Sequence, residues 1–394
     1  MSLRFRARDK HARGDAGHPS DIADSSADAV RAADLPADAM HAAGDSAAAV
    51  RAAALDEGVR ARRAHLVIVG LAVFMVLAAG VSLMLGRYPI EPAQAIQMLA
   101  SLVLPLDQTW TNQQETLFFN VRLPRILLAL MVGCCLAAAG AAFQGTFQNP
   151  LVSPDILGAS QGAAFGAALA ILAGCGSFLV SANAFVFAII TVLLVLLVSS
   201  RAKGNRVLVT VLAGVMVSSL FSAGVSFTKL VADPQDDLPA ITYWLMGSLT
   251  GAKLDTNLLL SFIPMALGCI VLVALRWRIN ILTMGDEEAS TMGIDARKIR
   301  IVVILAATLV TAASVAVTGM IGWVGLVIPH LSRMIVGADY RRLLPTSMLM
   351  GASFLLIVDN ISRLATTAEI PIGILTAFVG APFFLYLITR KKKL

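Results

Sequence analysis

The 394-residue sequence is poor in charge: only 14% of its residues are Asp, Glu, Lys or Arg. The shortage is confined to residues 65–394, which hold 21 basic and 15 acidic residues, whereas residues 1–64 hold ten of each sign. With 57% hydrophobic residues and a mean hydropathy of +0.78, the longer part is too apolar for a soluble enzyme. The net charge of +6 is dispersed between apolar runs, which excludes a basic stripe for nucleic acid.

Cysteine and histidine are also scarce. The four cysteines lie within apolar stretches and form no CxxC motif, so neither a disulfide framework nor a zinc site is predicted; they are Cys134, Cys135, Cys175 and Cys269. Only His330 lies deep in the apolar part, and no second His, Cys or carboxylate neighbours it in the sequence. We therefore interpret His330 as a hydrogen-bonded structural residue, and we predict no metal site and no catalytic residue in this chain.

Residues 1–64 are rich in Ala, Asp, Ser and Arg and contain few aromatic or branched apolar residues. Such a composition buries too little surface to offset the chain entropy lost on folding. We therefore predict a disordered N-terminal tail over residues 1–64. An alternative for its last part is a weak amphipathic helix at about residues 47–63.

From residue 66 onward, apolar stretches recur that are each long enough for a hydrocarbon core of roughly 30 Å. The sequence predicts an all-α, polytopic membrane domain over residues 65–394, with ten helices at about 66–85, 121–145, 156–173, 178–199, 207–230, 256–276, 299–318, 320–337, 343–361 and 370–389. Prolines inside or at the ends of helices predict broken helices that line a cavity. Gly158, Gly162 and Gly166 recur every four residues, which favours close helix packing.

The basic residues predict the orientation of these helices. One set of loops and helix ends holds 18 basic residues, and the other side holds six, namely Arg87, Arg122, Arg125, Lys229, Lys253 and Arg363. Basic residues accumulate on the cytoplasmic side of a membrane protein. An even number of helices places both ends of the domain on that side, so both termini are predicted to be cytoplasmic.

The loop between the sixth and seventh predicted helices, residues 284–294, carries the most information. Its acidic residues Asp286, Glu287 and Glu288 suit the first turn of a short helix, and Gly293 suits its end. The segment also contains the apolar residues Ala289 and Met292. We interpret it as a short cytoplasmic docking helix. The alternative is an ordinary capped loop helix.

The pattern Gly-Asp-Glu-Glu-Ala-x3-Gly over 285–293 resembles the coupling helix of the FecCD-type permeases, which belong to type II ABC importers for iron-siderophore, haem and cobalamin. Further segments match this family in order across about residues 66–390. They are Arg-Leu-Pro-Arg at 122–125, Gln-Asn-Pro-Leu-Val-Ser-Pro at 148–154, Leu-Ala-Gly-Val at 212–215, Tyr-Trp-x2-Gly-Ser-Leu at 243–249, Gly-Trp-Val-Gly-Leu-Val-Ile-Pro-His at 322–330 and Glu-Ile-Pro-Ile-Gly at 369–373.

The resemblance implies a homodimer of this chain, two separate ATP-binding subunits and an extracytoplasmic substrate-binding protein. The sequence contains no GxxxxGK[ST] motif, so ATP and Mg²⁺ are expected on the partner ATPase, and no cofactor is expected on this chain. The coupling segment would comprise Gly285, Asp286, Glu287, Glu288, Ala289, Met292 and Gly293.

The resemblance also assigns two further groups of residues. Arg122, Arg125 and Arg363 would receive acidic side chains of the binding protein through directional guanidinium–carboxylate contacts; the alternative is that they snorkel to lipid headgroups. A cytoplasmic gate would be formed by Asn149, Pro150 and Leu151, for which the alternative is a simple helix-stop turn.

The family resemblance predicts a permease subunit in a bacterial inner membrane that moves an iron complex, either a siderophore chelate or haem, inward. Cobalamin and molybdate are alternative cargoes of the same architecture. An ion-coupled secondary transporter would need charged residues at mid-membrane, and an intramembrane enzyme would need a nucleophile–base pair or a metal triad. The sequence shows neither pattern.

Overall fold

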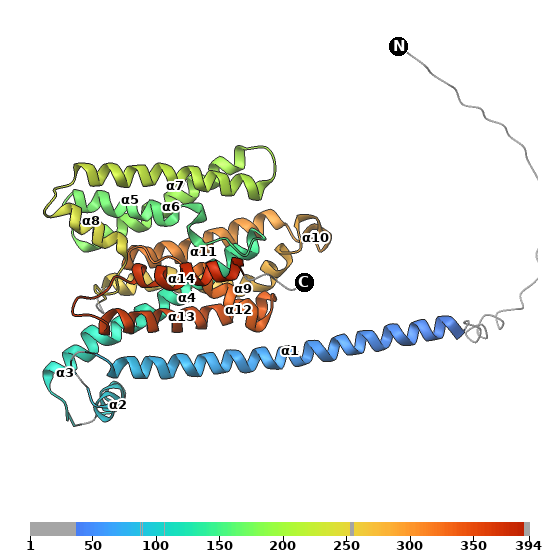
Figure 1. The fold of residues 1–394 in the computed structure, drawn as a ribbon, viewed down its shortest axis with the longest axis horizontal. Coiled ribbons are helices and arrows are strands. Elements are labelled where there is room, and N and C mark those ends of the chain that lie inside the picture. The colour runs from blue at the N-terminus through green and yellow to red at the C-terminus, as the bar shows by residue number, and fades with distance from the viewer. Residues whose placement is uncertain (1–36, 87, 89, 106, 253–255, 390–394) are drawn as a thin grey trace, which may run out of the picture. The chain divides into compact units, whose positions relative to one another are not determined.

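The computed structural model describes residues 37–86, 88, 90–105, 107–252 and 256–389, and these residues are almost entirely helical, with no β-strand among them. The predicted all-α fold class is confirmed. The chain divides into two compact units, residues 1–59 and 60–394. The second unit contains the membrane helices, and Figure 1 shows its elements.

Helix α1 (Ala37–Met84) begins well before the predicted start at residue 66. In the first unit, residues 37–59 are therefore helical, where the sequence analysis expected a disordered tail with a weak helix as the alternative. Alanine has the highest helix propensity of all residues, and this stretch is Ala-rich, which accounts for the difference. The remainder of the predicted tail, residues 1–36, lies outside the described residues.

The second unit continues from α1 through a succession of helices. Their bounds are α2 (Pro92–Ser101), α3 (Asn112–Leu117), a π-helical segment (Phe118–Arg122), α4 (Leu123–Thr146), a 3₁₀ turn (Pro154–Leu157), α5 (Ala159–Leu172), α6 (Ser177–Arg201), α7 (Arg206–Val231), α8 (Asp237–Met246), α9 (Thr256–Leu282), α10 (Asp286–Thr291), α11 (Ala296–Thr318), α12 (Val324–Val336), α13 (Tyr340–Leu364) and α14 (Ile372–Thr389).

Each of the ten predicted apolar stretches is helical in the structure. Seven helices in the described residues are long and apolar enough to cross a membrane, and α5, α12 and α14 supply three shorter apolar helices. At about 1.5 Å per residue, the 14 residues of α5 and the 13 of α12 reach only about 20 Å. These two helices cannot span the hydrocarbon core alone, as expected for broken helices.

Three short helices, α2, α3 and α8, were not predicted. They have ten, six and ten residues, which is too short for a membrane-length apolar pattern. One local signal was present for α3. Thr111 and Gln114 have the Thr-x-x-Gln spacing of a capping box, and both reciprocal hydrogen bonds are formed.

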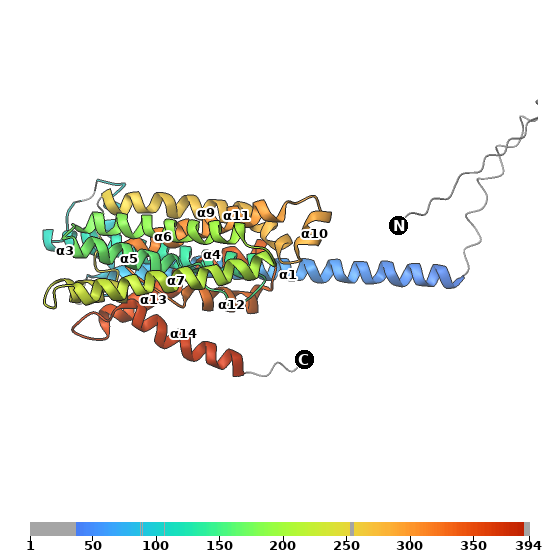
Figure 2. The same ribbon diagram turned by 90° about the horizontal axis from the view of Figure 1, so that it is seen from above.

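The helices of the second unit run side by side, with α10 at one end of the bundle and α3 at the opposite end in both views (Figures 1 and 2). Helix α4 is almost fully buried at the centre of the bundle and packs against α9, α11, α12 and α13. A Cβ built on Gly133 would lie 2.2 Å from the Gly351 carbonyl oxygen, and one on Gly140 would lie 1.8 Å from that of Gly325. Backbone-to-backbone packing therefore fixes α4 against α12 and α13.

The predicted glycine face of residues 158–166 is confirmed as a packing surface. Gly162 and Gly166 contact the backbone and side chains of α6, where a Cβ would meet Thr191 and the Asn183 carbonyl oxygen. Gly158 adopts a φ of +77° at the start of α5 and faces Ser218 of α7. Close approach of helix backbones replaces hydrophobic burial as the source of specificity in lipid.

Candidate functional site

Helix α10 forms the predicted docking element and projects at one end of the bundle (Figures 1 and 2). It begins after Gly285, whose φ of +126° is accessible to glycine. It ends in a Schellman motif, in which Gly293 N donates to Ser290 O at 3.0 Å and Ile294 N donates to Ala289 O at 2.9 Å. Gly293 has a φ of +74°, which this motif requires. The two predicted glycines thus set both ends of α10.

A small apolar cluster and one ion pair seat α10 on the bundle. Ala289 is fully buried against Ile281, Leu282 and Ala296, which belong to the end of α9 and the start of α11. Asp286 accepts two hydrogen bonds from Arg300, at 2.6 and 3.1 Å. The hydrogen bonds from Arg300 lower the pKa of Asp286. Ala289 and Asp286 therefore hold the helix in place.

The outward face of α10 consists of different residues. Glu287 and Glu288 are exposed, and Met292 and the preceding Met284 are 54% and 60% exposed. An acidic face with flexible methionines suits contact with a protein partner. Of the predicted coupling residues, Asp286, Glu287, Glu288, Met292 and Gly293 are exposed to such a partner, and Asp286 is also bound to Arg300.

The predicted gate segment follows α4 directly. Asn149 Oδ1 accepts a hydrogen bond from Leu151 N at 2.9 Å, which forms an Asx turn. Asn149 and Pro150 are exposed, and Leu151 is 53% exposed. The Asx turn agrees with the alternative that this segment simply ends the helix. The exposed apolar side chain of Leu151 agrees with the gate, because it could close a translocation path. The role of Asn149, Pro150 and Leu151 as a gate stays a prediction.

A second Schellman motif ends α4, and sequence reasoning did not find it. Gln148 N donates to Gly145 O at 3.3 Å and Asn149 N donates to Gln144 O at 3.1 Å. The left-handed position, usually glycine, is occupied by Gln148 with a φ of +52°. Its side chain donates from Nε2 to the Leu282 carbonyl oxygen at 2.8 Å. Gln148 therefore links the segment before residues 149–151 to the segment that leads into α10.

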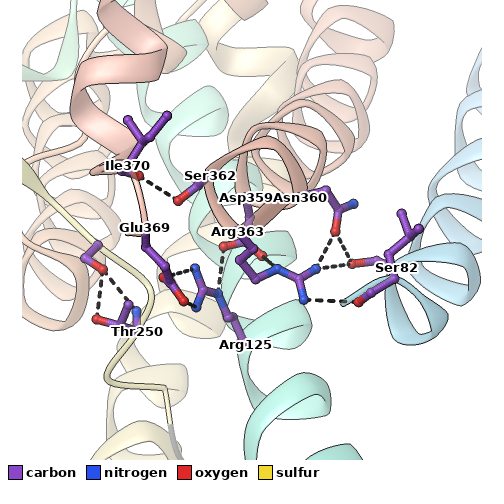
Figure 3. Close-up of polar contacts among 11 residues, drawn as sticks. Ser82, Arg125, Thr250, Asp359, Asn360, Ser362, Arg363, Glu369 and Ile370 are labelled. Carbon is purple, nitrogen blue, oxygen red and sulfur yellow. Dashed lines mark hydrogen bonds and ion pairs between the residues drawn. The ribbon is translucent and has the colours of Figure 1, made fainter. Parts of the chain in front are cut away.

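The arginines predicted to dock a binding protein lie near the opposite end of the bundle, where Figure 3 shows two of them. Arg125 is 6% exposed. Its Nε donates to Asp359 at 2.8 Å, and its Nη atoms donate to both carboxylate oxygens of Glu369 at 3.0 and 2.8 Å. Arg363 is ion-paired with Asp359 at 3.1 Å and donates to Ser82 at 3.0 Å.

Arg122 is bound by backbone carbonyl groups at the end of α1 rather than by a carboxylate. It is 3% exposed and donates from Nη1 to the carbonyl oxygens of Leu83 at 2.7 Å and Met84 at 3.1 Å. Arg122 is the last residue of the π-helical segment Phe118–Arg122, which precedes α4. Arg122 thereby satisfies carbonyl groups that the last turn of α1 leaves unpaired.

Arg122, Arg125 and Arg363 are thus bound by other groups of the same chain. These groups lie at the end of α1, at the end of α13 and in the connection 365–371. Asp359 is fully buried, and Glu369 is 36% exposed. A binding-protein carboxylate that contacts Arg125 would have to exchange with Glu369. Docking at these arginines stays a prediction. The sequence analysis did not connect Asp359 or Glu369 with Arg125, because nothing in the spacing of these residues indicates contact.

Comparisons with known proteins agree with this architecture. Residues 71–390 match the model of the FecCD transport family. The chain is 42% identical to a molybdate import system permease of Haemophilus influenzae, over 83% of this chain and 96% of that protein. It is 39% identical to a hemin transport system permease of Yersinia pestis, over 75% of this chain and 91% of that protein.

A solved structure described as an inward-facing conformation of a metal-chelate type ABC transporter superposes with a TM-score of 0.73. It is 41% identical, and the alignment covers 82% of this chain and 99% of that chain. The family match, the identity and the polytopic helical fold agree, so the chain is an integral membrane permease of an ABC importer and belongs to the FecCD transport family.

Proposed function

We propose that this chain is the membrane-spanning subunit of a binding-protein-dependent importer in a bacterial cytoplasmic membrane, with both termini in the cytoplasm. Two copies form the translocation path, and two separate subunits bind ATP and Mg²⁺ and hydrolyse the nucleotide, so this chain is not itself the enzyme. The observation that carries the proposal is α10, a short helix with a seated base and the exposed acidic residues Glu287 and Glu288.

In this proposal α10 inserts into a cleft of the ATP-binding subunit. The apolar cluster around Ala289 and the Asp286–Arg300 contact make α10 move together with the ends of α9 and α11. Closure of the ATP-binding subunits would then displace these helix ends and change the accessibility of the path between the two copies.

The cargo we propose is an iron complex, either a siderophore chelate or haem. The hemin permease and the metal-chelate type transporter among the relatives support this class. Molybdate is the second candidate, because the molybdate permease is 42% identical over 96% of its own length. Cobalamin remains a further cargo of the same architecture.

Uptake into proteoliposomes tests the function and the cargo together. The full chain is reconstituted with its ATP-binding subunits and its binding protein, and ferric hydroxamate, haem, cobalamin and molybdate are offered in turn. We expect ATP-dependent uptake of one iron complex. Uptake that persists without ATP hydrolysis would overturn the importer and favour an ion-coupled transporter, and uptake of molybdate alone would replace the cargo. Native mass spectrometry checks the two copies and the two ATP-binding subunits.

A charge reversal on the exposed face tests the coupling role of α10. Glu287 is exposed and forms no ion pair with another described residue, whereas the ion pair that fixes α10 to the bundle is made by Asp286. Glu287→Arg should therefore leave folding intact. We expect assembly or transport to fall at least tenfold while the thermal midpoint is unchanged. Lys298→Glu, a reversal of an exposed charge on α11, is the control. Normal transport by Glu287→Arg would contradict the assignment.

A further inference from the structure

A cavity of about 130 Å³ lies between the end of α6 and the beginnings of α7 and α11, at the α10 end of the bundle. Its volume is several times the roughly 30 Å³ that a water molecule occupies in the liquid. Two kinds of residue line it. The polar ones are Ser199, Ser200, Arg206, Thr210, Arg297 and Arg300, and the apolar ones are Leu196, Ile301 and Ile304.

The polar wall carries an excess of positive charge. Arg206 and Arg297 are exposed, and Arg300 is 6% exposed. Arg300 gives its two Nη groups to Asp286, while its buried Nε has no partner among the described residues. Asp286 is the carboxylate in contact with this group, and Arg206 contributes to lowering its pKa. Three arginines thus line the cavity, and the Asp286 carboxylate is hydrogen-bonded to one of them, Arg300.

The hydroxyl groups of the wall do not supply donors to a ligand. Ser199 and Ser200 donate to the Leu196 and Leu197 carbonyl oxygens at 3.1 and 2.7 Å. Thr210 donates to the Arg206 carbonyl oxygen at 2.7 Å. The free donors are therefore guanidinium groups, whose planar forks match phosphate oxygens.

The apolar wall identifies the kind of anion. Leu196, Ile301 and Ile304 continue into exposed apolar residues of the membrane-length helices α6 and α11, where Leu197 is 47% and Ile301 39% exposed. The cavity therefore joins an arginine cluster at the helix ends to a surface that acyl chains cover. An anionic phospholipid has its phosphate and its acyl chains in this arrangement, and basic recesses between membrane helices bind such headgroups.

We propose that this cavity binds the headgroup phosphate of an anionic phospholipid, with Arg206 and Arg297 contacting the phosphate oxygens and the acyl chains lying along Ile301 and Ile304. The unpartnered Nε of Arg300 supplies a further donor. Because Arg300 also holds Asp286, the occupied cavity stabilises the seat of α10. This site does not depend on the cargo or on the import direction.

Lipid binding to the purified full chain tests the site. Native mass spectrometry and thermal unfolding in a non-ionic detergent are followed while dioleoylphosphatidylglycerol is added, with dioleoylphosphatidylcholine and inorganic phosphate as separate arms. We expect saturable binding and a raised thermal midpoint with phosphatidylglycerol alone. An equal rise with phosphatidylcholine, or with inorganic phosphate, would overturn the assignment to an anionic lipid.

Two charge-matched double variants localise the binding. Arg206→Gln with Arg297→Gln should weaken phosphatidylglycerol binding at least tenfold. Arg278→Gln with Arg341→Gln removes two other exposed arginines outside the cavity and should change the affinity less than threefold. Equal losses in both would overturn the site in favour of general charge. Unchanged lipid binding in the first variant, with weaker binding of the ATP-binding subunits, would assign these arginines to a protein contact instead.

Discussion

Asp359 lies fully buried between two arginines, and its replacement by asparagine should destabilise the chain strongly. Its carboxylate is 2.8 Å from Arg125 Nε and 3.1 Å from Arg363 Nε. Asp359→Asn keeps the shape of the side chain but leaves two guanidinium groups with one carboxylate, Glu369. The perturbation is therefore almost purely electrostatic.

Removing one partner of a buried ion pair costs about 3–5 kcal/mol. We take about 3 kcal/mol, the low end, because Arg125 keeps its bidentate contact with Glu369 and Arg363 keeps Ser82. That cost shifts the folding equilibrium by a factor of roughly 100. Glu369→Gln should cost only about 1 kcal/mol, because Glu369 is 36% exposed and solvent screens its charge.

Reversible unfolding in mixed micelles, followed by tryptophan fluorescence as the denaturing detergent is increased, measures both free energies. Added salt provides an internal control, since it should reduce the effect of Glu369→Gln and leave that of Asp359→Asn nearly unchanged. The reasoning is refuted if Glu369→Gln destabilises more than Asp359→Asn, or if Asp359→Asn leaves the unfolding free energy unchanged.

Three further predictions follow from the packing and from the coupling end. Gln148→Gly relieves the strain of the left-handed backbone position and removes the hydrogen bond to Leu282, so the thermal midpoint should stay within about 2 °C while transport per ATP hydrolysed falls. Unchanged transport per ATP in this variant would contradict a role of the Gln148–Leu282 contact in coupling. Gly140→Ala should cost more than about 2 kcal/mol through a backbone clash, whereas Gly70→Ala, with open space around its Cβ, should be neutral or stabilising; equal effects in unfolding experiments would reject the packing argument. The lowered pKa of Asp286 means that its contact with Arg300 contributes fully above the unfolded pKa of about 3.9 and is lost as the pH falls through the folded pKa, which is lower. A spin label at Met292→Cys should therefore stay immobile at the unfolded pKa and gain mobility only at lower pH, and Asp286→Asn should show that mobility already at pH 7.

The positions of the membrane helices were predictable because the hydrocarbon thickness imposes a length and an apolar composition on every spanning segment. The glycines at the two ends of α10 were also predictable. Gly285 and Gly293 occupy backbone conformations that side chains disfavour, and this requirement is local. The extension of α1 to Ala37 was missed, since apolarity was the criterion and the helix there rests on alanine propensity.

The partners of the arginines were not predictable. Arg125 contacts residues 234 and 244 positions away, and no spacing in the sequence encodes that separation. The same holds for Gln148 and Leu282, which are 134 positions apart. Charge counting placed Arg125 on the outer side as an exception to the basic-residue rule, but it could not show that this charge is neutralised within the chain.

The sequence by itself determined an all-helical membrane chain, its broken helices, the family resemblance and a short acidic helix between α9 and α11. Those features depend on local composition, on backbone conformation and on the properties of the bilayer. Only the tertiary structure decided that Ala289 is buried while Met292 is exposed, and that Arg206, Arg297 and Arg300 share one cavity. It also decided that Arg122, Arg125 and Arg363 bind groups of this same chain. These depend on contacts between distant segments, because the packing of helices fixes which charges meet and which remain without a partner.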